Sequence, residues 1–168
     1  MTMPTTVHHW FERMVTETGR ICEDFYGGRL VTLAVFGSVA RNTMRPDSDV
    51  DMLIVADPLP RGRLARVDEF RTVELQLDPL LLAAAQVGIH TTLSPVLKTP
   101  AEVEQGSPLF LDMTDQVQIL YDKDDFFKSY LERLRARLKA QGAKRVRLRG
   151  GYYWVLKPSL KPGEEIPL

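Results

Sequence analysis

Apolar side chains near the start of the chain recur at helical spacing. The spacing predicts an amphipathic helix over residues 6–26, with one apolar face packed against a core. Gly27 and Gly28 follow, and glycine readily adopts the left-handed conformation that ends helices. Cys22 falls on the apolar face, so we expect a core residue rather than a nucleophile. The apolar positions are Val7, Trp10, Phe11, Met14, Val15, Ile21, Cys22 and Phe25.

Two apolar runs of strand length follow this helix. Residues 30–36 are mainly β-branched and apolar, stop at Gly37 and Ser38, and predict a strand followed by a short helical turn. Turn residues at 45–48 lead into a second predicted strand at 49–55, whose later half is continuously apolar. Such a run is typical of a strand that is buried on both faces of its sheet.

The rest of the chain predicts shorter elements. Residues 62–87 have a mostly helical pattern, and Pro79 should start a new helix or kink this one. Residues 89–98 resemble a third strand, in which Pro95 favours an edge position or a bulge. The other expected elements are short helices at 100–106 and 108–115, a short strand at 117–121, and a charged helix at 124–141 that ends at Gly142.

Composition excludes several classes of protein. The 168 residues suffice for one domain with a sizeable core, and the single cysteine cannot form an intramolecular disulfide. The 22 basic and 22 acidic residues cancel, which argues against nucleic acid as a partner. No apolar run approaches the roughly 20 residues of a membrane span. The first residues lack the order of a signal peptide, so we expect a cytoplasmic protein without membrane contact.

Charge is unevenly distributed towards the end of the chain. Residues 102–125 carry seven acidic side chains and one basic, whereas residues 128–149 carry nine basic side chains and one acidic. One interpretation is that two solvated surfaces pair with each other. The other is a basic patch that binds phosphate or an acidic partner.

Asp49 and Asp51 are the first candidates for chemistry. Side chains two residues apart on a strand point to the same face, so these carboxylates repel each other beside a buried apolar run. A divalent cation removes this repulsion, and Mg²⁺ commonly binds one or two carboxylates together with substrate phosphates. Taken alone, Asp-x-Asp favours an ordinary turn capped by Asp47 and Asp49 over a metal site.

Gly37 and Ser38 form the second candidate feature. They lie between an apolar strand and a short helical turn, where glycine allows close approach of a ligand and the N–H groups of the turn attract phosphate. Only ten residues separate Ser38 from Asp49, so the two strands should be neighbours and the two features should meet. Arg41 and Arg45 lie between them and are placed to contact a polyphosphate.

These residues resemble the minimal nucleotidyltransferase family of the DNA polymerase beta superfamily. The resemblance rests on Gly37-Ser38-Val39-Ala40-Arg41-Asn42 and on Pro46-Asp47-Ser48-Asp49-Val50-Asp51-Met52-Leu53-Ile54-Val55. It implies a polymerase-beta-like fold of the α/β (α+β) class, with a mixed β-sheet of three to five strands and helices mainly on one face. We expect the nucleotidyltransferase domain to span residues 1–123, with residues 124–168 as a helix and tail extension packed on it.

The resemblance also implies roles for individual residues. Asp49 and Asp51 would be the catalytic and metal-binding pair for Mg²⁺, with Mn²⁺ as an alternative ion. Gly37, Ser38, Arg41, Arg45 and Ser48 would bind the nucleoside triphosphate, which we expect to be ATP. Active members usually carry a third carboxylate on a later strand, and here Ser94 falls at that place on a strand without acids. Three other acids, Asp78, Glu102 and Glu104, are candidates for a third carboxylate that lies near the pair in the folded protein. His90 could act as a base.

Two functions follow from these features. The first is transfer of a nucleoside monophosphate to a hydroxyl of a protein or small molecule. The alternative is a catalytically impaired nucleotide-binding module that acts as an antitoxin-like partner of a HEPN toxin, since the third carboxylate is missing. A homo-oligomer, formed through the third strand or the basic helix, is compatible with the sequence.

Overall fold

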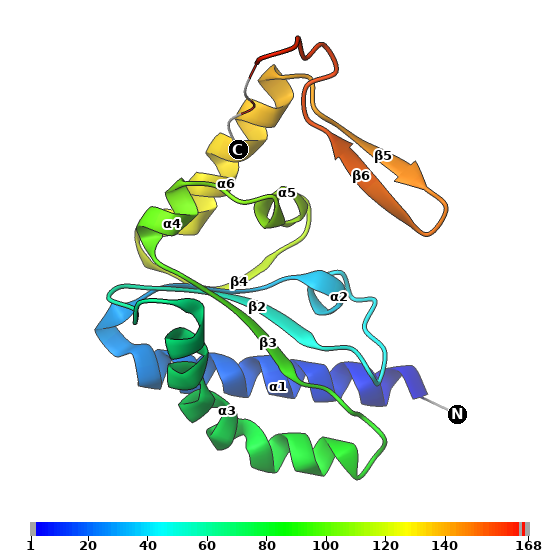
Figure 1. Cartoon of the computed structure of the whole chain (residues 1–168). Helices are drawn as coiled ribbons and strands as arrows, with labels where there is room; N and C mark the ends of the chain where they lie inside the picture. The colour runs from blue at the N-terminus through cyan, green and yellow to red at the C-terminus, as the bar shows by residue number, and fades with distance from the viewer. Residues whose placement is uncertain (1–2, 165, 167–168) are drawn as a thin grey trace.

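The computed structural model describes residues 3–164 and residue 166. Its centre is a mixed four-stranded sheet with the strand order β3-β2-β1-β4 (Figure 1). The central strands β1 and β2 are antiparallel, β4 is antiparallel to β1, and β3 is parallel to β2. The strands are β1 (Leu30–Val35), β2 (Val50–Ala56), β3 (Leu93–Lys98) and β4 (Gln118–Asp122).

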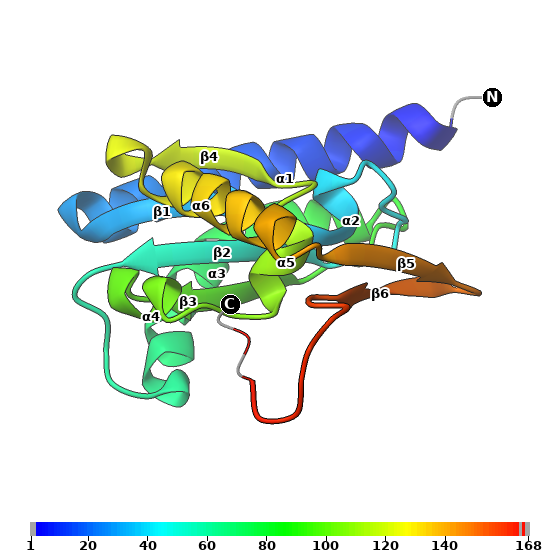
Figure 2. The ribbon, with the colours of Figure 1, turned by 90° about the horizontal axis from the view of Figure 1, so that it is seen from above.

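Helices cover both faces of this sheet (Figure 2). On β2, Met52 and Ile54 pack into one apolar cluster, while Leu53 and Val55 pack into another on the opposite face. The first cluster includes α1 (Met3–Tyr26) and α3 (Arg63–Ala85). The second includes α4 (Pro100–Glu104), α5 (Leu109–Met113) and α6 (Phe126–Ala140).

This arrangement confirms the predicted mixed sheet of three to five strands and corrects one detail of it. The two longest helices do share one face, but α4, α5 and α6, which were expected as helices without an assigned face, cover the other face. The physical reason is the continuous apolar run of β2, which leaves both of its faces in need of cover. Two 3₁₀ turns, η1 (Gly27–Arg29) and η2 (Lys123–Asp125), complete the connections.

The two prolines behave differently within their elements. Pro79 lies inside α3, which remains one helix, and Figure 1 shows this helix changing direction along its length. Such a bend is expected where proline removes a helical hydrogen bond. Pro95 lies in β3, which is an edge strand of the sheet and pairs with β2. An edge position was predicted because proline cannot donate a backbone hydrogen bond to a neighbouring strand.

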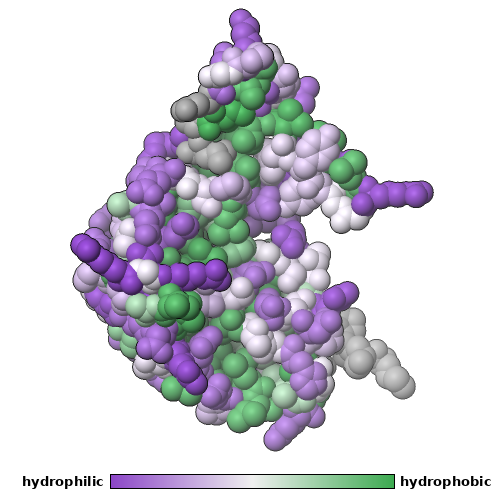
Figure 3. Space-filling view, in the orientation of Figure 1, coloured by the Kyte–Doolittle hydropathy of each residue, from purple (hydrophilic) through white to green (hydrophobic). Residues whose placement is uncertain are grey.

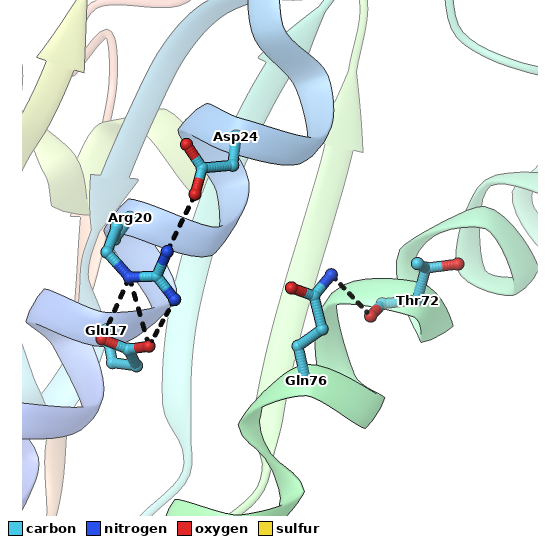
Figure 4. Close-up of polar contacts among 5 residues, drawn as sticks. All are labelled: Glu17, Arg20, Asp24, Thr72 and Gln76. Carbon is cyan, nitrogen blue, oxygen red and sulfur yellow. Dashed lines mark hydrogen bonds and ion pairs between the residues drawn. The ribbon is translucent and has the colours of Figure 1, made fainter.

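Helix α1 buries one face and exposes the other. Cys22 is fully buried on the packed face, as expected, and burial raises the pKa of its thiol to about 12. On the exposed face, Arg20 bonds to Glu17 at 2.7 Å and to Asp24 at 2.9 Å (Figure 4). Pairs at these spacings lie on one helix surface and support the helix only weakly, because water screens them.

The first residues of α6 pack against the same sheet. The Asp122 carboxylate accepts hydrogen bonds from the backbone N–H groups of Phe127 at 3.0 Å and Lys128 at 2.9 Å, which caps this helix. Leu131 and Leu134 of α6 share one apolar cluster with Ala34 of β1. The proposed division of the chain at residue 123 stays a prediction.

A two-stranded hairpin that the sequence did not predict follows α6. It consists of β5 (Lys144–Leu148) and β6 (Gly151–Val155) and forms a sheet of its own. In β5 basic residues alternate with Val146 and Leu148, so neither face of this strand has the apolar pattern that is typical of a strand packed on a core. None of the described helices is long and apolar enough to cross a membrane.

The uneven charge along the chain was interpreted either as two surfaces that pair or as a basic patch, and two ion pairs support pairing for part of the basic segment. Arg133 pairs with Glu104 at 2.6 Å, and Arg145 pairs with Asp115 at 2.7 Å. Basic residues of the later segment therefore do pair with acids of the earlier one. Lys144, Arg147 and Arg149 of the hairpin region form no ion pair within the described part of the chain, so a basic patch also remains there.

Candidate nucleotide and metal site

The acid pair lies where β2 begins. Asp51 is the second residue of β2 and is half-buried, while Asp49 directly precedes the strand and is exposed. Alternation along the strand places Asp51 on the same sheet face as Leu53 and Val55, which is the face covered by α4, α5 and α6. The structure thus puts the predicted carboxylates at one end of the sheet on one face.

Hydroxyl groups of the neighbouring chain segment contact both acids. Thr92 donates its Oγ1 hydrogen to Asp49 Oδ1 at 2.9 Å. Ser94 is the register partner of Asp51 in the parallel pairing of β2 with β3. Burial raises the pKa of Asp51, a hydrogen bond from Ser94 opposes this, and the Asp49 charge raises it further while Arg41 lowers it.

These surroundings fit a divalent cation. Burial and a like charge both destabilise ionised Asp51, and a bound cation would reverse both effects. Within residues 3–164 and 166, no three side chains of the His, Cys, Asp and Glu types converge as a complete metal site. Asp49 and Asp51 would therefore hold Mg²⁺ together with oxygens from phosphate and water, which is how this ion usually binds.

Gly37 brings the turn after β1 against the acid pair. It begins α2 (Gly37–Ala40) with a φ of 69°, a conformation that favours glycine. A Cβ atom at this position would overlap Asp51 Oδ2. The backbone N–H of Phe36 also donates to the Asp51 carbonyl oxygen at 3.0 Å. The predicted meeting of the Gly37-Ser38 corner with the Asp51 carboxylate is therefore a real contact.

The polar residues after α2 divide into two groups. Arg41 ends α2, is exposed, and acts electrostatically on Asp51. Arg45 pairs with Asp47 at 3.3 Å, and the Ser48 hydroxyl accepts a hydrogen bond from the Arg45 backbone N–H at 2.9 Å. Arg45 and Ser48 thus stabilise the turn before β2, and their predicted contact with nucleotide stays a prediction.

The other acids considered for a third ligand are engaged or distant. Two guanidinium hydrogen bonds from Arg66, at 2.7 and 3.0 Å, lower the pKa of Glu102 to about 2. Glu104 pairs with Arg133, and Asp78 is exposed on α3. His90 is exposed, and its backbone N–H donates to the Pro46 carbonyl at 2.8 Å. None of these side chains contacts Asp49 or Asp51 in the described structure, whereas the hydroxyl groups of Thr92 and Ser94 do.

Two features near the site were missed by the sequence analysis. A groove of about 670 Å³ follows the open edge of β3 and is lined by Ser94, Leu97, Arg66 and Glu102 among others. The β5–β6 hairpin lies on the same side of the sheet as the acid pair (Figure 1). The aromatic run Tyr152-Tyr153-Trp154 was the available signal for the hairpin, but its partner strand carries no comparable pattern.

Comparisons with known proteins identify the family and the fold of the chain. The family model described as "Nucleotidyltransferase domain" matches residues 17–105. A protein of Methanocaldococcus jannaschii, named as a proposed protein adenylyltransferase, is 34% identical over 120 residues, which cover 70% of this chain and 76% of that protein. Spectinomycin adenyltransferase AAD(9) from Enterococcus faecialis, solved with ATP and spectinomycin, gives a TM-score of 0.53 at 12% identity over 78% of this chain and 66% of its own.

A toxin-antitoxin structure with AMP-PNP gives a TM-score of 0.45 at 16% identity, and the match covers 75% of this chain and 93% of that one. The similarity to AAD(9) shows the fold, and the family match includes α2, both acids and β3. The chain belongs to the nucleotidyltransferase domain family and is a nucleotidyltransferase.

Proposed function

We propose that this nucleotidyltransferase transfers AMP from ATP to a hydroxyl group of a protein acceptor, in a reaction that depends on Mg²⁺. The contact between Gly37 and Asp51 carries the proposal, because it joins a phosphate-binding corner to a half-buried carboxylate. The charge on Asp51 is disfavoured by burial and by Asp49, and a cation bound with a triphosphate would offset both effects.

In the proposed reaction, the acceptor oxygen attacks the α-phosphorus of ATP. One P–O bond forms to the acceptor, the P–O bond to the leaving pyrophosphate breaks, and the hydroxyl proton passes to a base or to water. When bound, Mg²⁺ (or Mn²⁺) would supply neutralisation of the negative charge that develops on the phosphates. Gly37 and Ser38 would hold the triphosphate, and Arg41 would add a positive charge beside it.

The proposed nucleotide and acceptor rest on separate arguments. The 34% identical relative is named as a protein adenylyltransferase, which supports ATP as donor and a protein as acceptor. The groove along β3 includes Ser94, the neighbour of Asp51, and would give an acceptor segment a path to a nucleotide bound at the acid pair. A small-molecule hydroxyl is the other acceptor class, and the same groove admits it.

The position of an isotope label in ATP tests the proposed reaction directly. The protein is incubated with Mg²⁺, candidate acceptors and ATP labelled either at the α-phosphate or at the γ-phosphate. Nucleotidyl transfer moves the α-label to the acceptor and releases the γ-label in pyrophosphate. Parallel reactions with GTP, CTP and UTP measure the preference for adenine, and reactions with EDTA or Mn²⁺ measure the dependence on metal.

Matched variants assign the activity to the acid pair. Asp49→Asn and Asp51→Asn keep the size of each side chain and remove its charge, and we expect each to lower transfer at least 100-fold. Asp57→Asn is the control, because this exposed acid lies just beyond the opposite end of β2. Equal loss in all three variants, or transfer of the γ-label, would contradict the proposal.

A second candidate function is an antitoxin-like module that binds nucleotide without turnover and acts on a HEPN-type partner. The observation that favours it is Ser94, which occupies the place where a third carboxylate would be expected. Here ATP with Mg²⁺ would raise the melting temperature, but no acceptor would be labelled. Co-purification with a partner protein, preserved in Asp49→Asn, would support this candidate.

A further inference from the structure

The β5–β6 hairpin is fixed at its base to α5. The Trp154 indole N–H donates to Asp112 Oδ1 at 3.2 Å, and Arg145 pairs with Asp115 at 2.7 Å. Trp154 and Leu156 also pack against the apolar cluster of α5 and α6. A two-stranded hairpin is marginally stable by itself, so these contacts hold it in place.

The pairing register defines an inner face of the hairpin. Arg145 is opposite Trp154, and Arg147 is opposite Tyr152. Directly opposed residues of antiparallel strands, and residues two apart on one strand, share a face. Because Trp154 contacts Asp112 of α5 and Arg145 contacts Asp115 just after α5, this inner face turns towards the molecule, and it continues outwards through Arg147 and Tyr152.

The inner face overhangs the end of the sheet that carries the acid pair. Asp51, α5 and the hairpin all lie on one side of the sheet, and Figure 1 shows the hairpin extending over α2. Arg41, at the end of α2, acts electrostatically on both Asp51 and Tyr152. Figure 3 shows the surface hollowed between the hairpin and the region below it.

Tyr152 and Arg147 both belong to the inner face of the hairpin and have groups available to a ligand. The Arg145 guanidinium lies 4.3 Å from the centre of the Tyr152 ring, and no other ring or cation contacts that ring within the described residues. Tyr152 is 38% exposed and is also hydrogen-bonded to Asp112, so its ring is fixed without being covered. Arg147 is exposed and forms no ion pair with any described residue.

From these relationships we infer that the inner face of the hairpin is the outer wall of the nucleotide site, where Tyr152 stacks on the nucleobase and Arg147 binds a phosphate of the same nucleotide. The inference rests on the proposed function. An aromatic ring held in place by a guanidinium group on one face offers its other face as a flat surface on which a base can stack. An unpaired arginine beside it offers two donors to phosphate oxygens.

Two ligands separate the two roles. Binding of ATP and of inorganic tripolyphosphate, each with Mg²⁺, is measured by calorimetry on the full chain. Tyr152→Leu should weaken ATP binding about 10- to 100-fold and leave tripolyphosphate binding unchanged, because only the base is lost. Arg147→Ala should weaken binding of both ligands about tenfold, and added salt should reduce this difference.

The hairpin offers matched controls on its other face. Tyr153 is 46% exposed, adjacent to Tyr152 and on the opposite face, so Tyr153→Leu should leave ATP affinity unchanged. Tyr152→Phe keeps the ring and should retain most of the affinity. Melting temperatures of all variants check that the hairpin base is intact.

The outcomes distinguish this inference from the proposed function. If Tyr152→Leu and Tyr153→Leu behave alike, or if Tyr152→Leu changes the KM of the acceptor and not that of ATP, the inference is overturned while nucleotide transfer stands. If the wild-type protein binds neither ATP nor tripolyphosphate with Mg²⁺, both proposals are overturned. Loss of ATP binding alone in Tyr152→Leu supports the inference.

Discussion

Ser94 lies directly opposite Asp51 in the parallel pairing of β3 with β2, and its hydroxyl group hydrogen-bonds to the Asp51 carboxylate. The site therefore has two acids and two hydroxyl groups, because Thr92 also donates to Asp49. An uncharged donor at this place relieves part of the repulsion that Asp49 exerts on Asp51. A third acid would add to that repulsion and to the binding of a cation.

Ser94→Asp tests this balance. We expect the variant to melt at a lower temperature than the wild type without metal, because a third carboxylate joins two others. With Mg²⁺ and ATP it should be stabilised by a larger increment, since tighter binding to the folded state raises stability. Differential scanning fluorimetry over a range of Mg²⁺ concentrations measures both effects, and Ser94→Asn is the uncharged control. An unchanged metal response would contradict the expectation.

Gly37→Ala tests the contact between α2 and the acid pair. The new methyl group would overlap Asp51 Oδ2, and the left-handed backbone would be strained by about 1–2 kcal/mol. We expect transfer to fall at least 100-fold, with a measurable loss of stability in urea titrations. Gly28→Ala is the control, because a Cβ atom there meets no other atom within 4 Å. Full activity in Gly37→Ala would show that the corner does not hold the triphosphate.

Glu102 should make stability depend on pH in acid. Hydrogen bonds from Arg66 lower its pKa from 4.5 to about 2 in the folded protein. Stabilisation by this carboxylate is therefore complete above the unfolded value of 4.5 and is lost as the pH falls towards 2. Glu102→Gln should lower the melting temperature by a few degrees at neutral pH and by less at about pH 3. A difference that grows on acidification would contradict this assignment.

Cys22 should be unreactive in the folded protein. Burial raises the pKa of its thiol to about 12, so almost no thiolate exists at neutral pH, and the side chain is fully buried. We expect no colour with Ellman's reagent in buffer and one equivalent of released thiolate after unfolding in urea. Rapid reaction of the native protein would indicate that α1 opens locally.

The local pattern of apolar residues was sufficient to predict the two central strands of the sheet. The apolar run at 30–36 became β1, and the run at 49–55 became β2 with a shift of one residue. Contact between Gly37 and Asp51 was also predictable, because the short connection between β1 and β2 leaves the chain few ways to arrange the ends of these strands. Ser94 was correctly placed as the residue on the third strand that lies beside the acids.

The parts that were missed depend on contacts distant in the chain. Trp154 reaches Asp112 across 42 residues, and no local pattern contains that partner. Glu102 was a candidate ligand until its pairing with Arg66, 36 residues away, became visible. Helices α4, α5 and α6 were expected, but their place on the second face depends on packing against β1 and β2, which are distant in the chain.

The β5–β6 hairpin leaves the body of the protein after α6 and is held to it through Asp112 and Asp115 and through packing of Trp154. No strand of the central sheet pairs with it. Its tip can therefore change in length and residues during evolution while β1, β2 and β3 keep their geometry. If the hairpin forms part of the nucleotide site, as we infer, ligand binding and folding of the central sheet would depend on different stretches of the chain.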